Sequence, residues 1–125
     1  MFDIDTCLQQ MMALRGVLGA SLIDVPSGLT VGSAGRAPGG EDRSPHSEAA
    51  GLVCATMRTA AFATVGRPQH VEDVVITAGN GYHLMRTLAD SGGRLVAYLW
   101  LDRSSGNLAV AQRQLGAIAT QFAPN

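Results

Sequence analysis

The chain has 125 residues, a length typical of one domain and too short for two of ordinary size. Only 15% of its residues are charged, against about 25% in an average soluble domain, so we expect a partner to cover part of its surface. The net charge is −1 and all 9 cations are Arg. The sequence therefore has neither the basic stripe of a nucleic-acid-binding protein nor a lysine for a P-loop or a Schiff base.

The first 34 residues predict a helix followed by a β-hairpin. Apolar side chains recur at helical spacing over residues 3–14, and Gly16 follows as a stop signal. The apolar run of residues 17–25 and the thinner run of residues 29–34 are separated by the turn residues Pro26-Ser27-Gly28. We expect the first strand of this hairpin to be buried and the second to lie near an edge.

A second helix is expected from Ser47, after a loop at residues 35–46 that lacks the Gly-Lys-Ser/Thr ending of a phosphate-binding loop. One side of this middle helix has an ordinary apolar stripe for packing on a sheet. The opposite side carries apolar or small residues at spacings of three, four and three, namely Leu52, Ala55, Thr59 and Phe62. This pattern favours a helix that meets another helix. A covering loop, or scattered apolar surface residues, would also account for it.

The second half of the chain predicts a three-stranded meander and a last helix. The strands are expected at residues 70–78, 82–89 and 94–102, joined by short turns rich in Gly, Asn, Asp and Ser. The third run is apolar on both alternating faces, as in a central strand, whereas the first is charged enough for an edge. Asn107 can cap a helix whose apolar stripe is Leu108, Ala111, Leu115, Ile118 and Phe122.

No catalytic, metal or cofactor site is predicted. The residues that such a site could combine are His46, His70, His83, Asp73, Asp90 and Cys54. None has a recognised metal-ligand spacing, and no serine has a nucleophile-elbow context. Tyr98 and Trp100 are expected to pack in the core. Cys7 and Cys54 are expected to be reduced and buried, since a chain without a signal peptide or an 18-residue apolar span is expected in the cytoplasm.

Three stretches resemble the Roadblock family of dynein light chains and their bacterial relatives. They are MMALRGVLGASLIDVPSGLTVGSAG, EDVVITAGNGYHLMRTL and LVAYLWLDRSSGNLAVAQRQL. The first contains the Gly-Val-x-Gly-Ala strand and the Asp-x-x-Gly-Leu type of turn, here with a Pro-Ser insertion, and the others are most similar to actinobacterial members. The resemblance covers residues 3–121, within one domain expected to span residues 1–125.

The resemblance implies an α/β fold of the α+β kind, a profilin-like sandwich in the order α-β-β-α-β-β-β-α. Its five-stranded antiparallel sheet would have one helix on one face and two on the other. It also implies a non-catalytic homodimer that binds or regulates a small Ras-like GTPase, with a sensor kinase-like protein as a further candidate partner. Middle helices would cross the dyad and third strands would join into a ten-stranded sheet, which gives the interface Leu52, Ala55, Arg58, Thr59, Phe62, Val71, Asp73 and Val75.

The residues alone leave a second function open. A five-stranded sheet with helices on it can enclose a small ligand, as sensor domains do. Inward positions of the predicted strands are mostly Ala, Val and Leu, which favours a filled core over a polar cavity. We therefore expect the scaffold rather than the sensor, with no cofactor, no nucleic acid and no membrane insertion.

Overall fold

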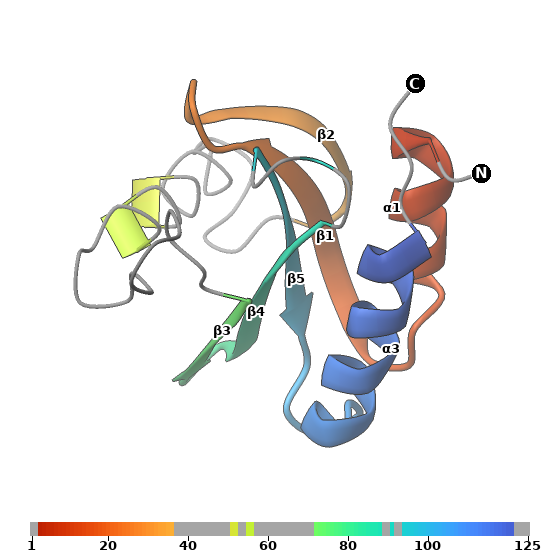
Figure 1. Cartoon of the computed structure of the whole chain (residues 1–125). Coiled ribbons are helices and arrows are strands. Elements are labelled where there is room, and N and C mark those ends of the chain that lie inside the picture. The colour runs from red at the N-terminus through yellow and green to blue at the C-terminus, as the bar shows by residue number, and fades with distance from the viewer. Residues whose placement is uncertain are drawn as a thin grey trace.

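The computed structural model describes residues 3–36, 51–52, 55–56, 72–88, 91 and 94–121. They form an α+β arrangement (Figure 1). In chain order the elements are α1 (Ile4–Met12), β1 (Val17–Asp24), β2 (Leu29–Gly35), β3 (Asp73–Ala78), β4 (Gly81–Thr87), β5 (Leu95–Leu101) and α3 (Leu108–Gln121). The predicted hairpin, meander and terminal helices are all confirmed, with ends that differ by a few residues. Residues 70 and 71, predicted to begin β3, lie outside the described residues.

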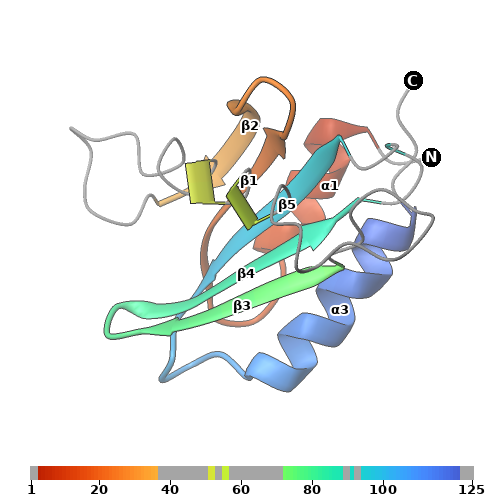
Figure 2. The ribbon, with the colours of Figure 1, turned by 60° about the vertical axis from the view of Figure 1, so that its left-hand side comes forward.

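The five strands form one antiparallel sheet in the order β2-β1-β5-β4-β3 (Figure 2). β5 is central, and β2 and β3 are the edges, as the sequence predicted. The pairing of β1 with β5 joins the N-terminal hairpin to the C-terminal meander. A register shift between Leu22 and Ile23 leaves Val31 of β2 without an opposite residue, which is the two-against-one arrangement of a β-bulge.

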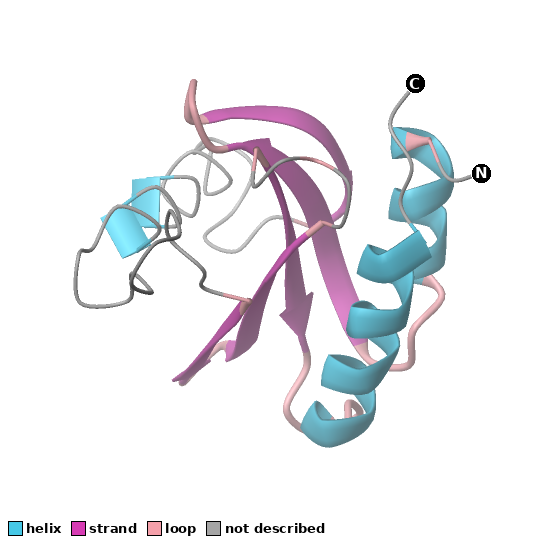
Figure 3. Ribbon diagram, viewed as in Figure 1, coloured by secondary structure: helices cyan, strands magenta, loops and turns pink. Residues whose placement is uncertain are grey.

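Strand β5 is buried on both sides, with every side chain from Val96 to Leu101 at most 7% exposed. Its side chains alternate between two cores. On what we call the first face, Ala97, Leu99 and Leu101 pack against α1 and α3, which both lie on that side (Figure 3). On the second face, Val96, Tyr98 and Trp100 join a smaller cluster with residues of β1 and β4. Tyr98 and Trp100 are thus core residues, as predicted.

Both described helices begin at a side-chain cap. The carboxylate of Asp3 accepts a hydrogen bond from the backbone N–H of Thr6 at 2.8 Å, and Asn107 Oδ1 accepts one from Val110 at 3.1 Å. Each cap satisfies a backbone donor that the first helical turn leaves without an intrahelical partner. The predicted cap at Asn107 is confirmed.

The predicted middle helix falls mostly outside the described residues, which give bounds for two helices rather than three. Residues 51–52 and 55–56 are helical, and the Thr56 hydroxyl donates to the Leu52 carbonyl oxygen at 2.8 Å. Figures 1 and 2 place these residues, drawn in yellow, on the opposite side of the sheet from α1 and α3. Cys7 is buried as predicted, whereas Cys54 lies outside the described residues.

Two glycines are required where backbones approach closely. Gly16 has a φ of 85°, and a Cβ there would lie 2.5 Å from the Cα of Gly106, in the loop before α3. At Gly19 in β1, a Cβ would lie 1.8 Å from the carbonyl oxygen of Arg36. Neither obstacle is a movable side chain, so both positions exclude larger residues.

We expect Gly19→Ala to lower the free energy of unfolding by about 3 kcal/mol or more, because the backbone after β2 must move away from β1. Urea denaturation followed by circular dichroism measures this change. Gly79→Ala is the matched control, since a Cβ at Gly79 meets nothing within 4 Å. Equal stability of the two variants would contradict the predicted clash.

Candidate functional site

The middle-helix residues of the predicted interface, which we call the helix seam, are Leu52, Ala55, Arg58, Thr59 and Phe62. The described part of this seam is exposed to solvent. Leu52 is 43% exposed and Ala55 is also exposed. These two residues therefore have the surface position that a helix–helix contact between subunits requires. The other seam residues, Arg58, Thr59 and Phe62, lie outside the described residues.

The described part of the predicted strand interface lies on the edge strand β3. Asp73 is exposed and faces Arg86 of β4, with which it forms an ion pair of 3.6 Å. Val75 packs at the margin of the first core. Val71, the third predicted residue, lies outside the described residues. Among the described strands β3 pairs only with β4, so its outer edge is open to another strand.

The two groups of predicted residues are not brought together. Val75 points to the first face, and Asp73, two positions away on the same strand, shares that side. The helical stretches 51–52 and 55–56, to which the other two predicted residues belong, lie on the opposite side of the sheet. An interface that uses both groups must therefore wrap around the β3 edge.

A hydrogen-bonded cluster of aromatic residues occupies the second face near the β3–β4 turn. His83 Nε2 lies 2.8 Å from Asn80 Oδ1, and His83 Nδ1 lies 2.6 Å from the Tyr98 hydroxyl. Because the amide oxygen only accepts, Nε2 donates to it, and in the neutral imidazole Nδ1 then accepts the Tyr98 proton. Trp100 Nε1 donates to the Asn80 carbonyl oxygen at 2.9 Å, and the Arg36 guanidinium lies 5.8 Å from the Trp100 ring centre.

Burial disfavours the charged forms in this cluster. It lowers the pKa of His83 and raises the pKa of Tyr98. Both imidazole nitrogens of His83 already have partners, so the ring is a structural link between β4, β5 and the turn. His83 is thus a hydrogen-bonded residue of the sheet.

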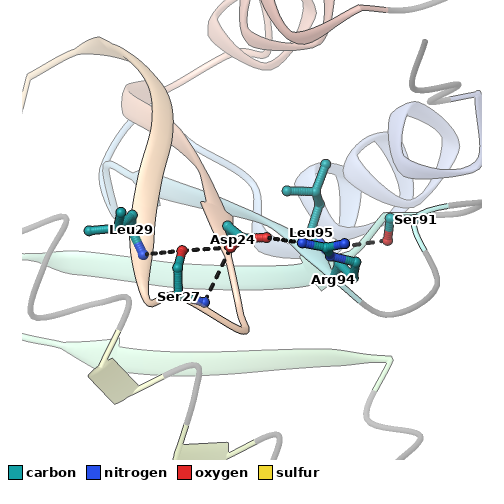
Figure 4. A network of polar contacts seen from close by, with 6 residues as sticks. All are labelled: Asp24, Ser27, Leu29, Ser91, Arg94 and Leu95. Carbon is teal, nitrogen blue, oxygen red and sulfur yellow. Dashed lines mark hydrogen bonds and ion pairs between the residues drawn. The ribbon is translucent and has the colours of Figure 1, made fainter.

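A polar network closes the other end of the sheet (Figure 4). The Asp24 carboxylate accepts from the Ser27 hydroxyl at 2.5 Å and from the Ser27 N–H at 3.2 Å, while Arg94 lies 3.8 Å away. The Ser27 hydroxyl in turn accepts from the N–H of Leu29. These hydrogen bonds, chiefly that from the Ser27 side chain, lower the pKa of Asp24. The inserted Pro-Ser of this turn is thus part of its stabilising network.

A groove of about 480 Å³ separates α1 from α3 on their solvent side. Four glutamines line it, Gln9 and Gln10 from α1 and Gln114 and Gln121 from α3, with small or apolar residues between them. Sequence reasoning missed this groove. The available signal was one exposed row of residues along α3, Val110, Gln114, Ala117 and Gln121, none of which is charged.

The described residues contain little else that supports chemistry. No three His, Cys, Asp or Glu side chains among them lie close enough to hold a metal ion. Burial raises the pKa of the Cys7 thiol to about 11, which leaves it protonated and unreactive at neutral pH. Neither described helix is long and apolar enough to cross a membrane.

His83 makes stability depend on pH. Its folded pKa is depressed, so its contribution is complete above the unfolded value of about 6.5 and is lost as the pH falls toward the folded pKa. We expect the urea midpoint to fall between pH 7.5 and pH 5.5, and to fall less in His83→Gln, which keeps a neutral amide there. An equal fall in both proteins would contradict this assignment.

The contribution of Asp24 to stability also decreases as the pH falls, but over a more acidic range. Its folded pKa is also depressed, so its contribution is complete above the unfolded value of about 3.9 and is lost as the pH falls through the folded value. We expect Ser27→Ala to raise the pKa of Asp24 toward 3.9, because the largest cause of the shift is removed. An NMR titration of the Asp24 side-chain carbonyl carbon measures this directly, and an unchanged midpoint would contradict it.

No profile of a known protein family and no curated protein matches the sequence. Solved structures do match. A structure described as MglB with a tetrameric arrangement has a TM-score of 0.71 at 16% identity, over 94% of this chain and 82% of that chain. MglB of Myxococcus xanthus has a TM-score of 0.70 at 17% identity, over 95% and 87%. A Roadblock/LC7 domain of Streptomyces avermitilis has a TM-score of 0.68 at 19% identity, over 94% and 92%.

At these identities the comparisons establish a fold, and they agree with the element order of the described residues. The chain has the Roadblock/LC7 fold.

Proposed function

We propose that the chain forms a homodimer and that this dimer is a non-catalytic cytoplasmic scaffold for a small Ras-like GTPase. The observation that carries the proposal is Leu52, a large apolar side chain 43% exposed on a helical stretch. In a monomer such a position is expected to be polar, whereas burial against a second subunit removes its apolar surface from water.

The proposed dimer uses the middle helix and the β3 edge together. The middle helix would continue beyond the described residues, so that Leu52, Ala55, Arg58, Thr59 and Phe62 meet the same residues of a second subunit. The open edge of β3, including Val71, Asp73 and Val75, would pair with its counterpart and extend the sheet to ten strands. Support for this dimer comes from the edge position of β3 and from the small side chains of Ala55 and Thr59 between the larger seam residues.

The partner is proposed from the sequence resemblance. The chain resembles Roadblock proteins that are encoded beside a small Ras-like GTPase and a sensor kinase-like protein. Only 15% of the residues are charged, which agrees with a molecule much of whose surface is covered by other proteins.

A second candidate function, a small-molecule sensor, is favoured by one observation. The hydroxyls of Ser21 and Thr30 are buried, and neither has a hydrogen-bond partner among the residues that the structure describes. Ser21 lies opposite Tyr98 and Thr30 lies opposite Ile23, so both hydroxyls belong to the second face. A small polar ligand could satisfy them. A stoichiometric ligand in native mass spectra of the purified protein would favour this function over the scaffold.

The scaffold is tested by Leu52→Arg. The substitution would bury an unpaired charge in both subunits, at a cost of several kcal/mol, because a closed dimer uses the same surface twice. We expect the mass of the assembly in sedimentation velocity to be halved. Binding to the proposed Ras-like GTPase partner, measured by biolayer interferometry, should be lost with it.

The control is Gly51→Arg, at an exposed neighbouring position where a Cβ meets nothing within 4 Å. It should keep both the mass and the binding. A Leu52→Arg protein that is folded by circular dichroism and keeps the parental mass would exclude the proposed dimer. One that loses the dimer but still binds the GTPase would exclude the paired helices as the binding surface.

A further inference from the structure

The turn between β3 and β4 ends in the dipeptide Asn80-Gly81, in which Gly81 is the first residue of β4. Asn80 alone among the asparagines of the sequence is followed by glycine. An asparagine side chain can reach the main-chain nitrogen of the next residue through a five-membered ring, and a glycine there has no side chain to hinder the approach. Asn80 is exposed, so water has access to it. The turn therefore contains the reactants of a spontaneous deamidation.

Packing requires a glycine at position 81. Gly81 has a φ of 140°, and a Cβ there would lie 2.5 Å from the carbonyl oxygen of Leu101 and 2.8 Å from Nε1 of Trp100. The first of these obstacles is backbone, so a side chain at this position would push β4 away from β5. The fold thus requires, directly after Asn80, the residue type that hinders ring closure least.

Both carbonyl groups of Asn80 accept a hydrogen bond from the aromatic cluster. His83 Nε2 donates to the side-chain Oδ1 at 2.8 Å, and Trp100 Nε1 donates to the main-chain carbonyl oxygen at 2.9 Å. A donor on a carbonyl oxygen stabilises the negative charge that this oxygen acquires when a nucleophile attacks its carbon. Attack of the Gly81 nitrogen on Cγ places that charge on Oδ1, beside His83.

We propose that Asn80 is a deamidation site and that the reaction places a carboxylate against the aromatic cluster. The Gly81 nitrogen bonds to Asn80 Cγ, the Cγ–Nδ2 bond breaks, and ammonia leaves with the proton of the Gly81 N–H. Water then opens the cyclic imide at one of its two carbonyl groups. Opening at Cγ gives aspartate, whose carboxylate lies at His83. Opening at the main-chain carbonyl gives isoaspartate, whose carboxylate replaces the carbonyl group that accepts from Trp100.

The aspartate product changes the protonation of His83. Burial alone favours the neutral ring and lowers the pKa of His83, whereas a carboxylate beside the ring favours the imidazolium. Both nitrogens of an imidazolium donate, so Nδ1 then donates to the Tyr98 hydroxyl instead of accepting from it. One deamidation thus reverses the direction of a hydrogen bond between β4 and β5.

The neighbours of His83 leave the new carboxylate as the source of this change. On β3 the residue opposite His83 is the apolar Ile76, and on β5 the ring contacts Tyr98, whose pKa is raised by burial. Two cations flank the cluster, Arg36 over its indole ring and Arg103, which donates to a carbonyl oxygen at the end of β3. Neither guanidinium titrates near neutral pH.

Incubation of the purified protein at neutral pH and physiological temperature tests the modification. Peptide mapping by mass spectrometry separates asparagine, aspartate and isoaspartate at position 80, and the same protein unfolded in urea sets the time scale. We expect Asn80 to convert in the folded protein, while Asn107, which caps α3 and precedes Leu108, stays intact. If folded protein keeps Asn80 intact over the time in which the unfolded chain converts completely, the site is excluded.

Asn80→Asp tests the effect on His83, because it supplies the aspartate product directly with almost the same side-chain shape. We expect His83 to titrate at least about one pH unit higher in this variant than in the parent, as measured by NMR of the imidazole carbons. Asn80→Gln is the neutral control and should titrate as the parent does, and circular dichroism checks the fold of both variants. The same midpoint for His83 in Asn80→Asp and Asn80→Gln would exclude the proposed change of protonation.

Discussion

The rest of the structure depends on a central strand that is apolar on both faces. Every side chain of β5 from Val96 to Leu101 is nearly inaccessible to solvent. A strand of this kind cannot lie on the surface of a two-layer protein, since each face needs its own cover. The α1–α3 layer supplies one cover and contributes half of the buried residues of the larger core. The same strand lies between β1 and β4 and joins the N-terminal hairpin to the meander. Its central position therefore accounts both for its burial and for the continuity of the sheet.

Polar side chains are concentrated at the two ends of this sheet, where the ladder of backbone hydrogen bonds stops. At one end Asn80 accepts from both His83 and Trp100. At the other end the Asp24 carboxylate accepts two hydrogen bonds from Ser27 and lies near Arg94. Asn80 contacts β5 through its backbone carbonyl oxygen, and the Asp24 carboxylate contacts Arg94 just before β5, so each residue joins segments that are distant in sequence. The ends of an apolar sheet are thereby fixed without placing an unpaired charge inside it.

Local patterns were sufficient to predict most of the fold. Pro26-Ser27-Gly28 predicts the hairpin turn, and Asn107 predicts the start of α3. The run of residues 95–101, apolar on both faces, predicts the central strand. Each of these signals depends on neighbours in the chain. The Roadblock resemblance added the single five-stranded antiparallel sheet and the dimer. The described residues show that Leu52 is exposed and that β3 is an edge strand, and they do not test the dimer itself.

What the sequence did not predict depends on contacts between distant segments. The groove exists because Gln9 and Gln114, more than 100 positions apart, lie on helices that pack side by side. The residue pattern within one helix does not indicate which other helix lies beside it. Similarly, the partners of His83 are a turn residue and a residue of the next strand, and the pattern of β4 alone identifies neither.

The pairing of β1 with β5 also governs how the chain can reach this structure. Leu22 pairs with Ala97, a separation of 75 residues (97 − 22), so the sheet cannot close until most of the polypeptide has left the ribosome. Until then the N-terminal hairpin exposes the apolar edge that later pairs with β5. Long-range strand pairing of this kind slows folding and leaves a nascent chain open to aggregation. The last strand to be synthesised, rather than the first, therefore completes the sheet.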